Sequence, residues 1–288
     1  MFCFVILHYM VIEETVAFVE NLLYQVDGSK EIIIVDNNSS NGSGKKLQEL
    51  YKNIPNVHVI LNMENLGFAK GNNIGYRFAK ENFNPKFIVI ANNDIELPQS
   101  DFISRVESIY EREQFAVLGP EIFSTNEEIF QSPKRLQPYS YKQVLDELRQ
   151  YEKKKNSKYI VPFKATLKKN RFIKKLNSIR KRSSSRIDPT KIYYNPIIHG
   201  SFIIVSEKFI AKRENAFFEG TYMYFETEIL AYQCKKDNLK VVYDPSIKVL
   251  HHHSTSTSST FSSELKKVRF MNNCIYDSLQ AFLNEMER

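Results

Sequence analysis

The fold is decided by the stretch Phe87-Ile-Val-Ile-Ala-Asn-Asn-Asp-Ile-Glu-Leu97. Its first five residues are apolar and rich in β-branched types, which predicts a strand buried on both faces. Asn92, Asn93 and Asp94 follow at the carboxyl end of that strand, where open parallel sheets bind their ligands. A carboxylate at this place suits a hard divalent cation that also contacts phosphate. The alternative is a plain turn, since Asn and Asp favour turns.

Outward from this stretch, predicted strands and helices alternate in both directions. On the amino-terminal side we expect strands at Phe2–Leu7, Glu31–Val35 and Val57–Leu61, and helices at Glu13–Tyr24, Lys45–Tyr51 and from Asn65 to about Asn82. Such alternation predicts an α/β fold with a mostly parallel sheet flanked by helices on both faces.

The carboxyl-terminal side is less regular. We expect a helix to Glu111, a strand at Ala116–Gly119, an irregular stretch over 121–140, a strand at Ile197–Val205, a loop leading into a helix over Phe217–Lys235, strands at Lys240–Tyr243 and Ile247–Leu250, and a final helix at Glu264–Met286. These elements predict a single domain over 1–288, with a basic, partly helical insertion at 141–190 and a C-terminal helix within 260–288.

Composition places the chain among ordinary globular proteins. Hydrophobic residues make up 42% of its 288 residues and charged residues 25%. No apolar run approaches the roughly 20 residues that span a bilayer. The three cysteines, Cys3, Cys234 and Cys274, are scattered and fit neither a metal site nor a disulfide framework, so we expect a reducing, cytoplasmic compartment.

The net charge of +7 is concentrated in one segment. Between Glu152 and Arg186, fourteen basic residues accompany one acid, so this segment carries +13 and the remainder about −6. Apolar residues are interspersed: Tyr159, Ile160, Phe163, Leu167, Phe172, Ile173 and Leu176. We expect Tyr141–Arg186 to lie against an anionic membrane or a lipid-linked acceptor. The alternative is a solvated loop, and no recognised module accompanies the charge that would indicate nucleic-acid binding.

Polar residues follow the other predicted strands too. Asp36, after the second strand, is placed to accept a hydrogen bond from a base or ribose, although Asp at a strand end is often a turn former. His8 follows the first strand without a glycine, so a dinucleotide fingerprint is absent. Gly42-Ser-Gly44-Lys-Lys46 fails the spacing of a phosphate loop and lacks its Ser or Thr.

The most glycine-rich stretch is Asn65-Leu-Gly-Phe-Ala-Lys-Gly-Asn-Asn-Ile-Gly75, at a predicted loop-to-helix junction. Glycine lets backbone N–H groups approach a phosphate or sugar, and a helix N-terminus favours an anion. The alternative is a helix start with a flexible cap.

Two carboxylates open a later helix, within Phe217-Phe-Glu-Gly-Thr-Tyr-Met-Tyr-Phe-Glu226-Thr-Glu228. Acids are common in a first helical turn, but an acid beside aromatic residues also suits a sugar site with a general base. His251-His-His253 follows a strand and is either a metal ligand or an incidental cluster.

Taken together and in this order, these pieces resemble family 2 glycosyltransferases of the GT-A fold, and among them the bacterial transferases, rhamnosyl- or galactosyltransferase-like, that build surface polysaccharides. The resemblance runs from Phe4 to about Ser256 outside the basic insertion. It is carried by Ile34-Val-Asp-Asn-Asn-Ser39, Asn65–Gly75, Val89-Ile-Ala-Asn-Asn-Asp94, Gly200-Ser-Phe-Ile-Ile204, Tyr222-Met-Tyr-Phe-Glu226 and Val249-Leu-His251.

The resemblance implies roles for these residues. Asp94 and His251 would hold Mg²⁺ or Mn²⁺ on the donor diphosphate, and Asp36 would contact the nucleobase. The set expected to bind the nucleotide is His8, Asp36, Asn65, Gly67, Lys70, Asn72 and Asn93. The implied reaction is inverting transfer from a nucleotide-sugar to a growing, lipid-linked glycan, by a protein held peripherally at the inner face of the cell membrane.

Two departures from the family pattern matter. Asn92 occupies the first acidic position of the D-x-D-like motif, which leaves one carboxylate for the metal. Thr227 replaces the second acid of the Glu-Asp pair, so the general base is either Glu226 or Glu228. We favour Glu226, because the aromatic run before it would raise a carboxyl pKa, and expect Glu228 to face outward.

Two other functions compete with this one. A nucleotidyltransferase shares the nucleotide-binding half, but normally has a glycine-rich signature with Arg after the first strand, where this chain has His8-Tyr-Met10. A non-catalytic protein that binds lipid or polyanion would be explained by the basic segment alone.

Overall fold

The computed structural model describes residues 1–156, 187–252 and 263–288. Its strands are β1 (Phe2–His8), β2 (Lys30–Asp36), β3 (Val57–Leu61), β4 (Phe87–Asn92), β5 (Ile95–Glu96), β6 (Val117–Ser124), β7 (Ile129–Phe130), β8 (Tyr193–Tyr194), β9 (Phe202–Ser206) and β10 (Val241–His251). Its helices are α1 (Ile12–Tyr24), α2 (Ser43–Tyr51), α3 (Gly67–Phe83), α4 (Phe102–Glu113), α5 (Tyr141–Asn156), α8 (Glu207–Lys212), α9 (Glu226–Lys236) and α11 (Glu264–Met286).

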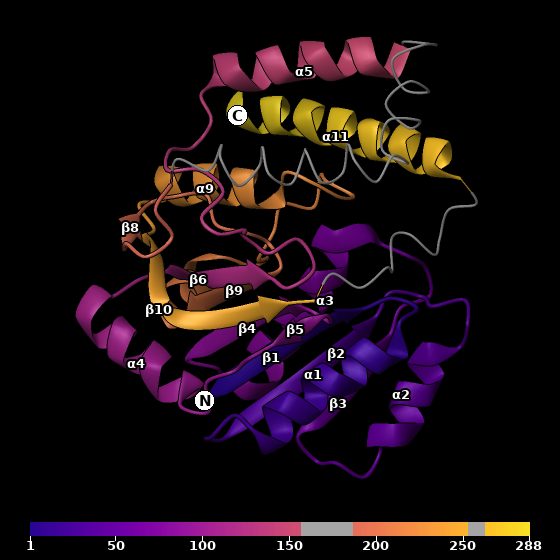
Figure 1. The fold of residues 1–288 in the computed structure, drawn as a ribbon, viewed down its shortest axis with the longest axis vertical. Coiled ribbons are helices and arrows are strands. Elements are labelled where there is room, and N and C mark those ends of the chain that lie inside the picture. The colour runs from indigo at the N-terminus through magenta and orange to yellow at the C-terminus, as the bar shows by residue number, and fades with distance from the viewer. Residues whose placement is uncertain (157–186, 253–262) are drawn as a thin grey trace.

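One twisted sheet organises these elements, in the order β3-β2-β1-β4-β9-β6-β10-β5, with β7 added to β6 and β8 to β10 (Figure 1). The first four strands of this order are parallel, as the alternating pattern predicts. Strand β9 runs antiparallel to both neighbours, β4 and β6. The parallel half therefore brings the carboxyl ends of β1, β2 and β4 to one edge.

Successive side chains of a strand point to opposite faces of the sheet, so each face has its own hydrophobic core. In β4, Phe87, Val89 and Ala91 face the core that is covered by α1, α2 and α4. Ile88 and Ile90 face the opposite core, which is covered by α3, α8 and α9. A five-residue apolar run fits this place because a strand between two helical layers buries both of its faces.

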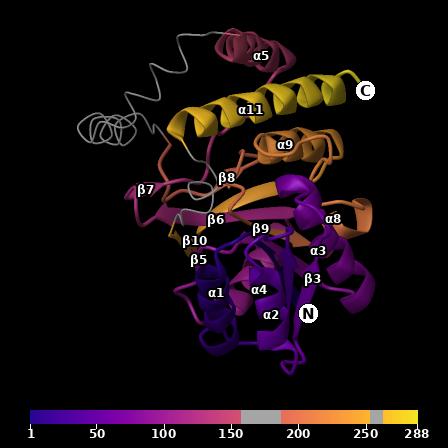
Figure 2. The ribbon, with the colours of Figure 1, turned by 90° about the vertical axis from the view of Figure 1, so that its right-hand side faces the viewer.

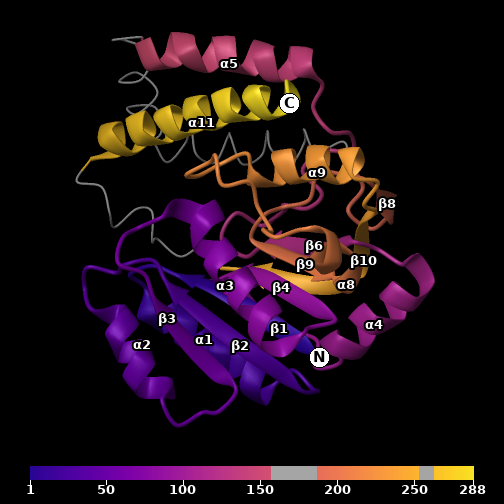
Figure 3. The same ribbon diagram turned by 180° about the vertical axis from the view of Figure 1, so that it is seen from behind.

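A third layer covers α9 from outside. Helices α9, α11 and α5 lie one above another on one side of the sheet (Figures 1, 2 and 3). Their shared core consists of Val144, Ile229, Leu279, Phe282 and Leu283. The first part of the expected insertion at 141–190 is thus a packed helix, and the final helix has the predicted bounds.

Helix α5 forms the described part of Tyr141–Arg186, the segment whose membrane contact stays a prediction. Val144 is buried, and Leu145, Leu148 and Tyr151 pack against the same core, so the apolar face of α5 contacts protein. The interspersed apolar residues from Tyr159 to Leu176 lie outside the described residues. Within the described ranges, none of the helices combines the length and the apolar character that crossing a membrane requires.

The larger boundary differences from the sequence prediction lie in the carboxyl-terminal half of the sheet. Strand β6 continues to Ser124, and β10 is one strand where two were expected. The pairing of β10 with β6 shifts between Asp244 and Lys248, because a bulge accommodates Pro245 without ending the strand. Strand β9 begins only at Phe202, since the residues before it form the turn described below.

Candidate functional site

Three of the predicted residues meet at the carboxyl edge of the sheet because of the strand register. His8 at the end of β1 pairs with Asp36 at the end of β2. On the other side of β1, Leu7 pairs with Asn92 at the end of β4. Parallel strands with aligned ends thus bring segments that are far apart in sequence to a single place.

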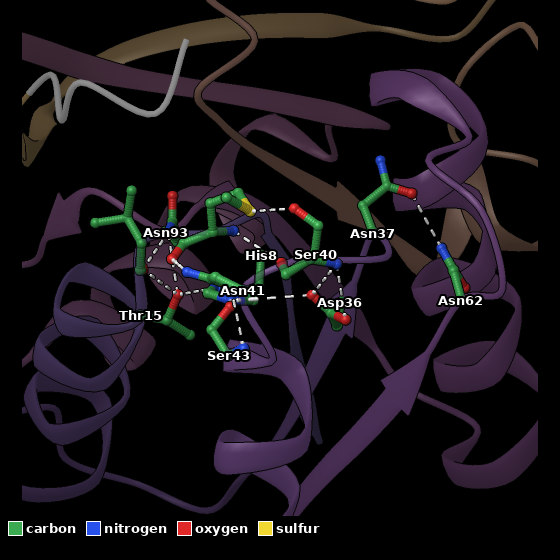
Figure 4. A network of polar contacts seen from close by, with 12 residues as sticks. His8, Thr15, Asp36, Asn37, Ser40, Asn41, Ser43, Asn62 and Asn93 are labelled. Carbon is green, nitrogen blue, oxygen red and sulfur yellow. Dashed lines mark hydrogen bonds and ion pairs between the residues drawn. The ribbon is translucent and has the colours of Figure 1, made fainter. Parts of the chain in front are cut away.

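His8 is the centre of a buried polar network (Figure 4). Its Nδ1 lies 2.6 Å from Thr15 Oγ1 and its Nε2 lies 2.7 Å from Ser43 Oγ. Burial lowers the pKa of His8 to about 4, although the nearby Asp36 acts against this. The ring is therefore neutral at neutral pH and joins β1 to the first turns of α1 and α2. Its expected contact with a nucleotide remains a prediction.

Asn93 joins the same network from β4. Its Nδ2 donates to Thr15 Oγ1 at 3.0 Å and to the carbonyl of Val11 at 3.2 Å (Figure 4). The structure thus gives Asn93 a positioning role at the start of α1. The role in nucleotide binding that the resemblance implies remains a prediction.

Asp36 is held rigidly at the end of β2 and is 5% exposed. The backbone N–H of Ser39 donates to both carboxylate oxygens, at 3.3 and 3.2 Å. A Cβ at Gly44 would stand 2.1 Å from Asp36 Oδ2. Gly44 is therefore needed for the close contact between α2 and this carboxylate, a role that its resemblance to a phosphate loop did not indicate.

Asn37 is a site residue that sequence reasoning missed. Its Nδ2 donates to Asn65 Oδ1 at 3.0 Å and to the carbonyl of Gly67 at 3.1 Å. Its Oδ1 accepts from Asn62 Nδ2 and from the backbone N–H of Leu66 (Figure 4). Asn37, directly after β2, thus fixes the loop before α3. The one indication of this role in the sequence is that Asn37 adjoins Asp36.

Close packing around α3 leaves no room for a Cβ at its three glycines. Gly67 has φ +77°, and a Cβ there would lie 2.3 Å from the carbonyl oxygen of Tyr222. At Gly71 a Cβ would lie 2.7 Å from a Leu7 methyl, and at Gly75 2.4 Å from a Val5 methyl. They let the helix approach β1 closely, which explains the glycine spacing without any ligand.

The other two predicted residues of this helix differ in exposure. Lys70 is exposed, as a side chain that reaches a ligand must be. Asn72 is fully buried, and its Nδ2 donates to the carbonyl of Phe68 at 2.9 Å. Asn72 therefore lies inside the protein, where it stabilises the first turns of α3.

Asp94 and His251 are brought together by the antiparallel pairing of β5 with β10. Ile95 pairs with His251, and the backbone N–H of His252 donates to the carbonyl of Asp94 at 2.9 Å. Asp94 Oδ1 lies 3.2 Å from His251 Nε2. These residues are 7% and 3% exposed. Chain segments on either side of the basic insertion thus form one site, as the resemblance implies.

This donor set fits a divalent ion. A carboxylate oxygen and an imidazole nitrogen that converge are suitable ligands for Mn²⁺ or Mg²⁺, with the carboxylate the harder of the two. Over the described ranges, no group of three or more His, Cys, Asp or Glu side chains surrounds a possible metal position. The remaining ligands would have to be diphosphate oxygens and water.

A pocket of about 290 Å³ opens beside Asn92. Aromatic and apolar side chains form much of its wall, and its polar groups include Lys134, His199, Ser201 and the two carboxylates of α9. Its full lining is Phe68, Asn92, Lys134, His199, Gly200, Ser201, Met223, Tyr224, Phe225, Glu226, Thr227, Glu228 and Ile275. Its mixture of aromatic and polar groups suits a sugar.

His199 connects this pocket to the pair of Asp94 and His251. Its ring centroid lies 5.9 Å from that of His251. Its Nδ1 lies 2.8 Å from Ser201 Oγ, and the carbonyl of Ser201 accepts from the backbone N–H of Asn92 at 2.8 Å. The turn before β9 therefore joins the end of β4 to the pocket wall.

Glu226 lies in this pocket at the start of α9 and is 7% exposed. Burial raises its pKa to about 7; the carboxylate of Glu228 adds to the rise, while a backbone hydrogen bond, Lys134 and Thr221 act against it. Its Oε1 has no hydrogen-bond partner among the residues that the structure describes. A carboxyl group with these properties suits a general base near neutral pH.

Glu228 is also buried, which corrects the expectation that it faces outward. Its Oε1 forms an ion pair with Lys134, and its Oε2 accepts from Thr227 Oγ1 at 3.2 Å. It is turned inward because the segment after β7 brings Lys134 over the start of α9, a contact that the sequence pattern does not show. With both oxygens engaged, Glu228 is less available as a base than Glu226.

The backbone before Glu226 adopts an uncommon conformation. Tyr224 and Phe225 have φ of +75° and +68°, and neither is a glycine. Such residues cost about 1–3 kcal/mol each and cluster at functional sites. No sequence signal indicates this turn, which aims Glu226 into the pocket.

Comparison with known proteins agrees with this geometry. The sequence profile described as "Glycosyl transferase family 2" matches residues 3–175. Over 106 residues the chain is 26% identical to the low-salt glycan biosynthesis hexosyltransferase Agl10 of Haloferax volcanii, a match that covers 37% of this chain and 33% of that relative.

Solved structures show the same fold. S. aureus TarS aligns over 92% of this chain and 41% of its own, with a TM-score of 0.54 and 12% identity. GalNAc-T7 with UDP, GalNAc and Mn²⁺ aligns over 99% of this chain and 56% of its own, with a TM-score of 0.56 and 14% identity. The predicted GT-A fold is thereby confirmed. The chain spans well under two thirds of the length of these relatives.

Proposed function

Because the chain belongs to glycosyl transferase family 2, we propose that it transfers a sugar from a nucleotide-diphosphate donor to a glycan hydroxyl, with inversion. One observation carries the proposal: Glu226, buried and with a pKa of about 7, lines a sugar-sized pocket beside the carboxyl edge of the sheet. A base is required there because the acceptor hydroxyl must lose its proton as it attacks the anomeric carbon.

Donor binding would fall to the strand ends. Asp36 and the loop that Asn37 fixes would bind the nucleoside, and Lys70 at the exposed start of α3 would contact phosphate. Asp94 and His251 would hold Mg²⁺ or Mn²⁺. When bound, such an ion neutralises the diphosphate and makes it a better leaving group.

The acceptor would occupy the pocket with its hydroxyl directed toward the Glu226 carboxylate. Phe68, Tyr224 and Phe225 would contact the sugar ring and exclude water that would otherwise hydrolyse the donor. Glu228 would remain paired with Lys134. A single base suffices for direct displacement, so the sugar would leave with inverted configuration and no covalent intermediate would form.

The first experiment is a thermal-shift and hydrolysis screen of nucleotide-sugars with and without Mn²⁺. We expect one donor to stabilise the protein selectively, and Asp94→Asn to lower turnover by orders of magnitude because the charge on the diphosphate is then poorly compensated. The matched control is Glu96→Gln, a partly exposed carboxylate two residues further on that pairs with His252. Full activity of Asp94→Asn in EDTA would contradict the metal role.

The proposed function also includes an acceptor and a membrane contact. We propose a lipid-linked surface glycan and peripheral attachment to an anionic membrane, on the basis of the charge of +13 over Glu152–Arg186. Flotation with vesicles tests the attachment: we expect binding to anionic vesicles that weakens with salt. Equal binding to neutral vesicles would contradict the electrostatic contribution.

A further inference from the structure

The structure assigns a positioning role to Gln131, which no part of the proposed mechanism uses: its side-chain carbonyl orients His251 for metal binding. Gln131 Oε1 lies 2.7 Å from His251 Nδ1. An amide oxygen can only accept, so the proton of this contact belongs to Nδ1. The inference rests on the proposed function, because it concerns the same metal.

The backbone of His251 is already fixed on both sides. It pairs with Ser124 of β6 and with Ile95 of β5, and its carbonyl accepts from the backbone N–H of Thr125 at 3.1 Å. The backbone does not set the orientation of the ring or the nitrogen that carries the proton. A hydrogen bond to Nδ1 acts on both.

The backbone of Gln131 is held by a hydrogen bond to the central sheet. It follows β7, and its backbone N–H donates to the carbonyl of Ile122 in β6 at 2.8 Å. The side-chain carbonyl of Gln131 therefore contacts His251 from a segment that is hydrogen-bonded to the central sheet. With the Nδ1 proton held by Gln131, the lone pair that a metal ion would need lies on Nε2, the nitrogen that is 3.2 Å from Asp94 Oδ1.

The chemical reason for such a partner is general. Histidines that bind metals nearly always donate their second ring N–H to an oxygen, which fixes the tautomer and raises the basicity of the ligand, and removing the partner costs 10–100-fold in affinity. A site to which the described residues contribute one carboxylate and one imidazole depends strongly on this effect. Gln131 would thus offset part of the loss that Asn92 causes at the first acidic position.

Two substitutions separate this role from simple packing. Gln131→Met keeps the volume but removes the acceptor, and we expect it to weaken Mn²⁺ binding by about 10–100-fold. Gln131→Glu keeps an acceptor and should bind Mn²⁺ at least as tightly as the unaltered protein. A packing role predicts the reverse order, since an apolar side chain of similar size is tolerated there and a partly buried charge is not.

The measurement is a titration of the full chain with Mn²⁺ alone, with free Mn²⁺ read by electron paramagnetic resonance and folding checked by circular dichroism. Glu96→Gln is the matched control, because it removes the charge that pairs with the neighbouring His252 and leaves Gln131 in place. If Gln131→Met does not fold, Gln131→Asn, whose amide is one methylene short, replaces it with the same expected loss.

The outcomes distinguish the two proposals. If the unaltered protein binds no Mn²⁺, or Asp94→Asn binds it equally well, the metal site of the proposed function fails. If Asp94→Asn loses Mn²⁺ while Gln131→Met binds like the unaltered protein, the role of Gln131 alone is wrong. Weaker binding by Gln131→Glu than by Gln131→Met would also overturn it.

Discussion

The two sides of the candidate site are built in different ways. The proposed donor side consists of strand ends, with His8 and Asp36 aligned by parallel register. The proposed acceptor pocket adjoins the end of β4 at Asn92 and combines Lys134, the turn around His199, the start of α9 and Ile275 of α11. The first side follows from a repeating pattern of strands, whereas the second depends on contacts between distant segments. We therefore expect substitutions on the two sides to affect different steps.

The largest effect is expected at the acceptor side. Glu226→Gln should keep donor binding but reduce transfer roughly 10²–10⁴-fold, because the hydroxyl then has no base. Glu228→Gln should reduce transfer less, since it loses only the pair with Lys134. Initial rates with a saturating donor measure both. Normal transfer by Glu226→Gln together with an inactive Glu228→Gln would place the base two residues later.

The second-largest effect is expected on the stability of the layer formed by α5, α9 and α11. Phe282→Ala removes a fully buried ring that packs against Tyr232, and should lower the free energy of unfolding by about 3–5 kcal/mol. Denaturant unfolding measures the change, with Gln280→Ala on the exposed face of α11 as control. Donor binding should persist at low denaturant. Loss of donor binding in the folded variant would show that the two sides are not separable.

A smaller effect is expected from the donor side. Gly44→Ala places a Cβ against the carboxylate of Asp36 and forces it to move. We expect the KM for the donor to rise by roughly 10²-fold, because displacement of a positioning group by about 1 Å has effects of this size. Steady-state kinetics measure it, with the exposed Ser40→Ala as control. An unchanged KM would remove Asp36 from donor recognition.

The smallest effect is a pH dependence of stability. The pKa of Glu226 is raised to about 7 in the folded protein, so between its ordinary value of 4.5 and 7 the folded state holds more protons than the unfolded state. Its contribution to stability therefore falls as pH rises through this window. Glu226→Gln should gain a few degrees in Tm relative to the unaltered protein at pH 8, and little at pH 4.5. A constant difference across this range would contradict the raised pKa.

The sequence predicted the parallel half well because burial on both faces leaves a clear trace. The run Phe87–Ala91 and the polar residues after it placed Asp94 correctly at the end of a strand, and the resemblance linked it to His251. By contrast, the contact of Lys134 with Glu228 leaves no periodic trace, so the outward orientation predicted for Glu228 was wrong. The apolar residues on one face of α5 likewise do not indicate from the sequence whether protein or lipid covers that face.

The site of Asp94 and His251 has a consequence for the synthesis of the protein. More than half of the chain lies between these two residues, and β10 is the last strand to be made. At ordinary rates of translation the ribosome needs on the order of ten seconds or more to reach His251 after Asp94 has been added. During the first part of that interval β4 lacks its neighbour β9, and throughout it Asp94 lacks its histidine. In a nascent chain the proposed metal position is therefore assembled only when the sheet is closed.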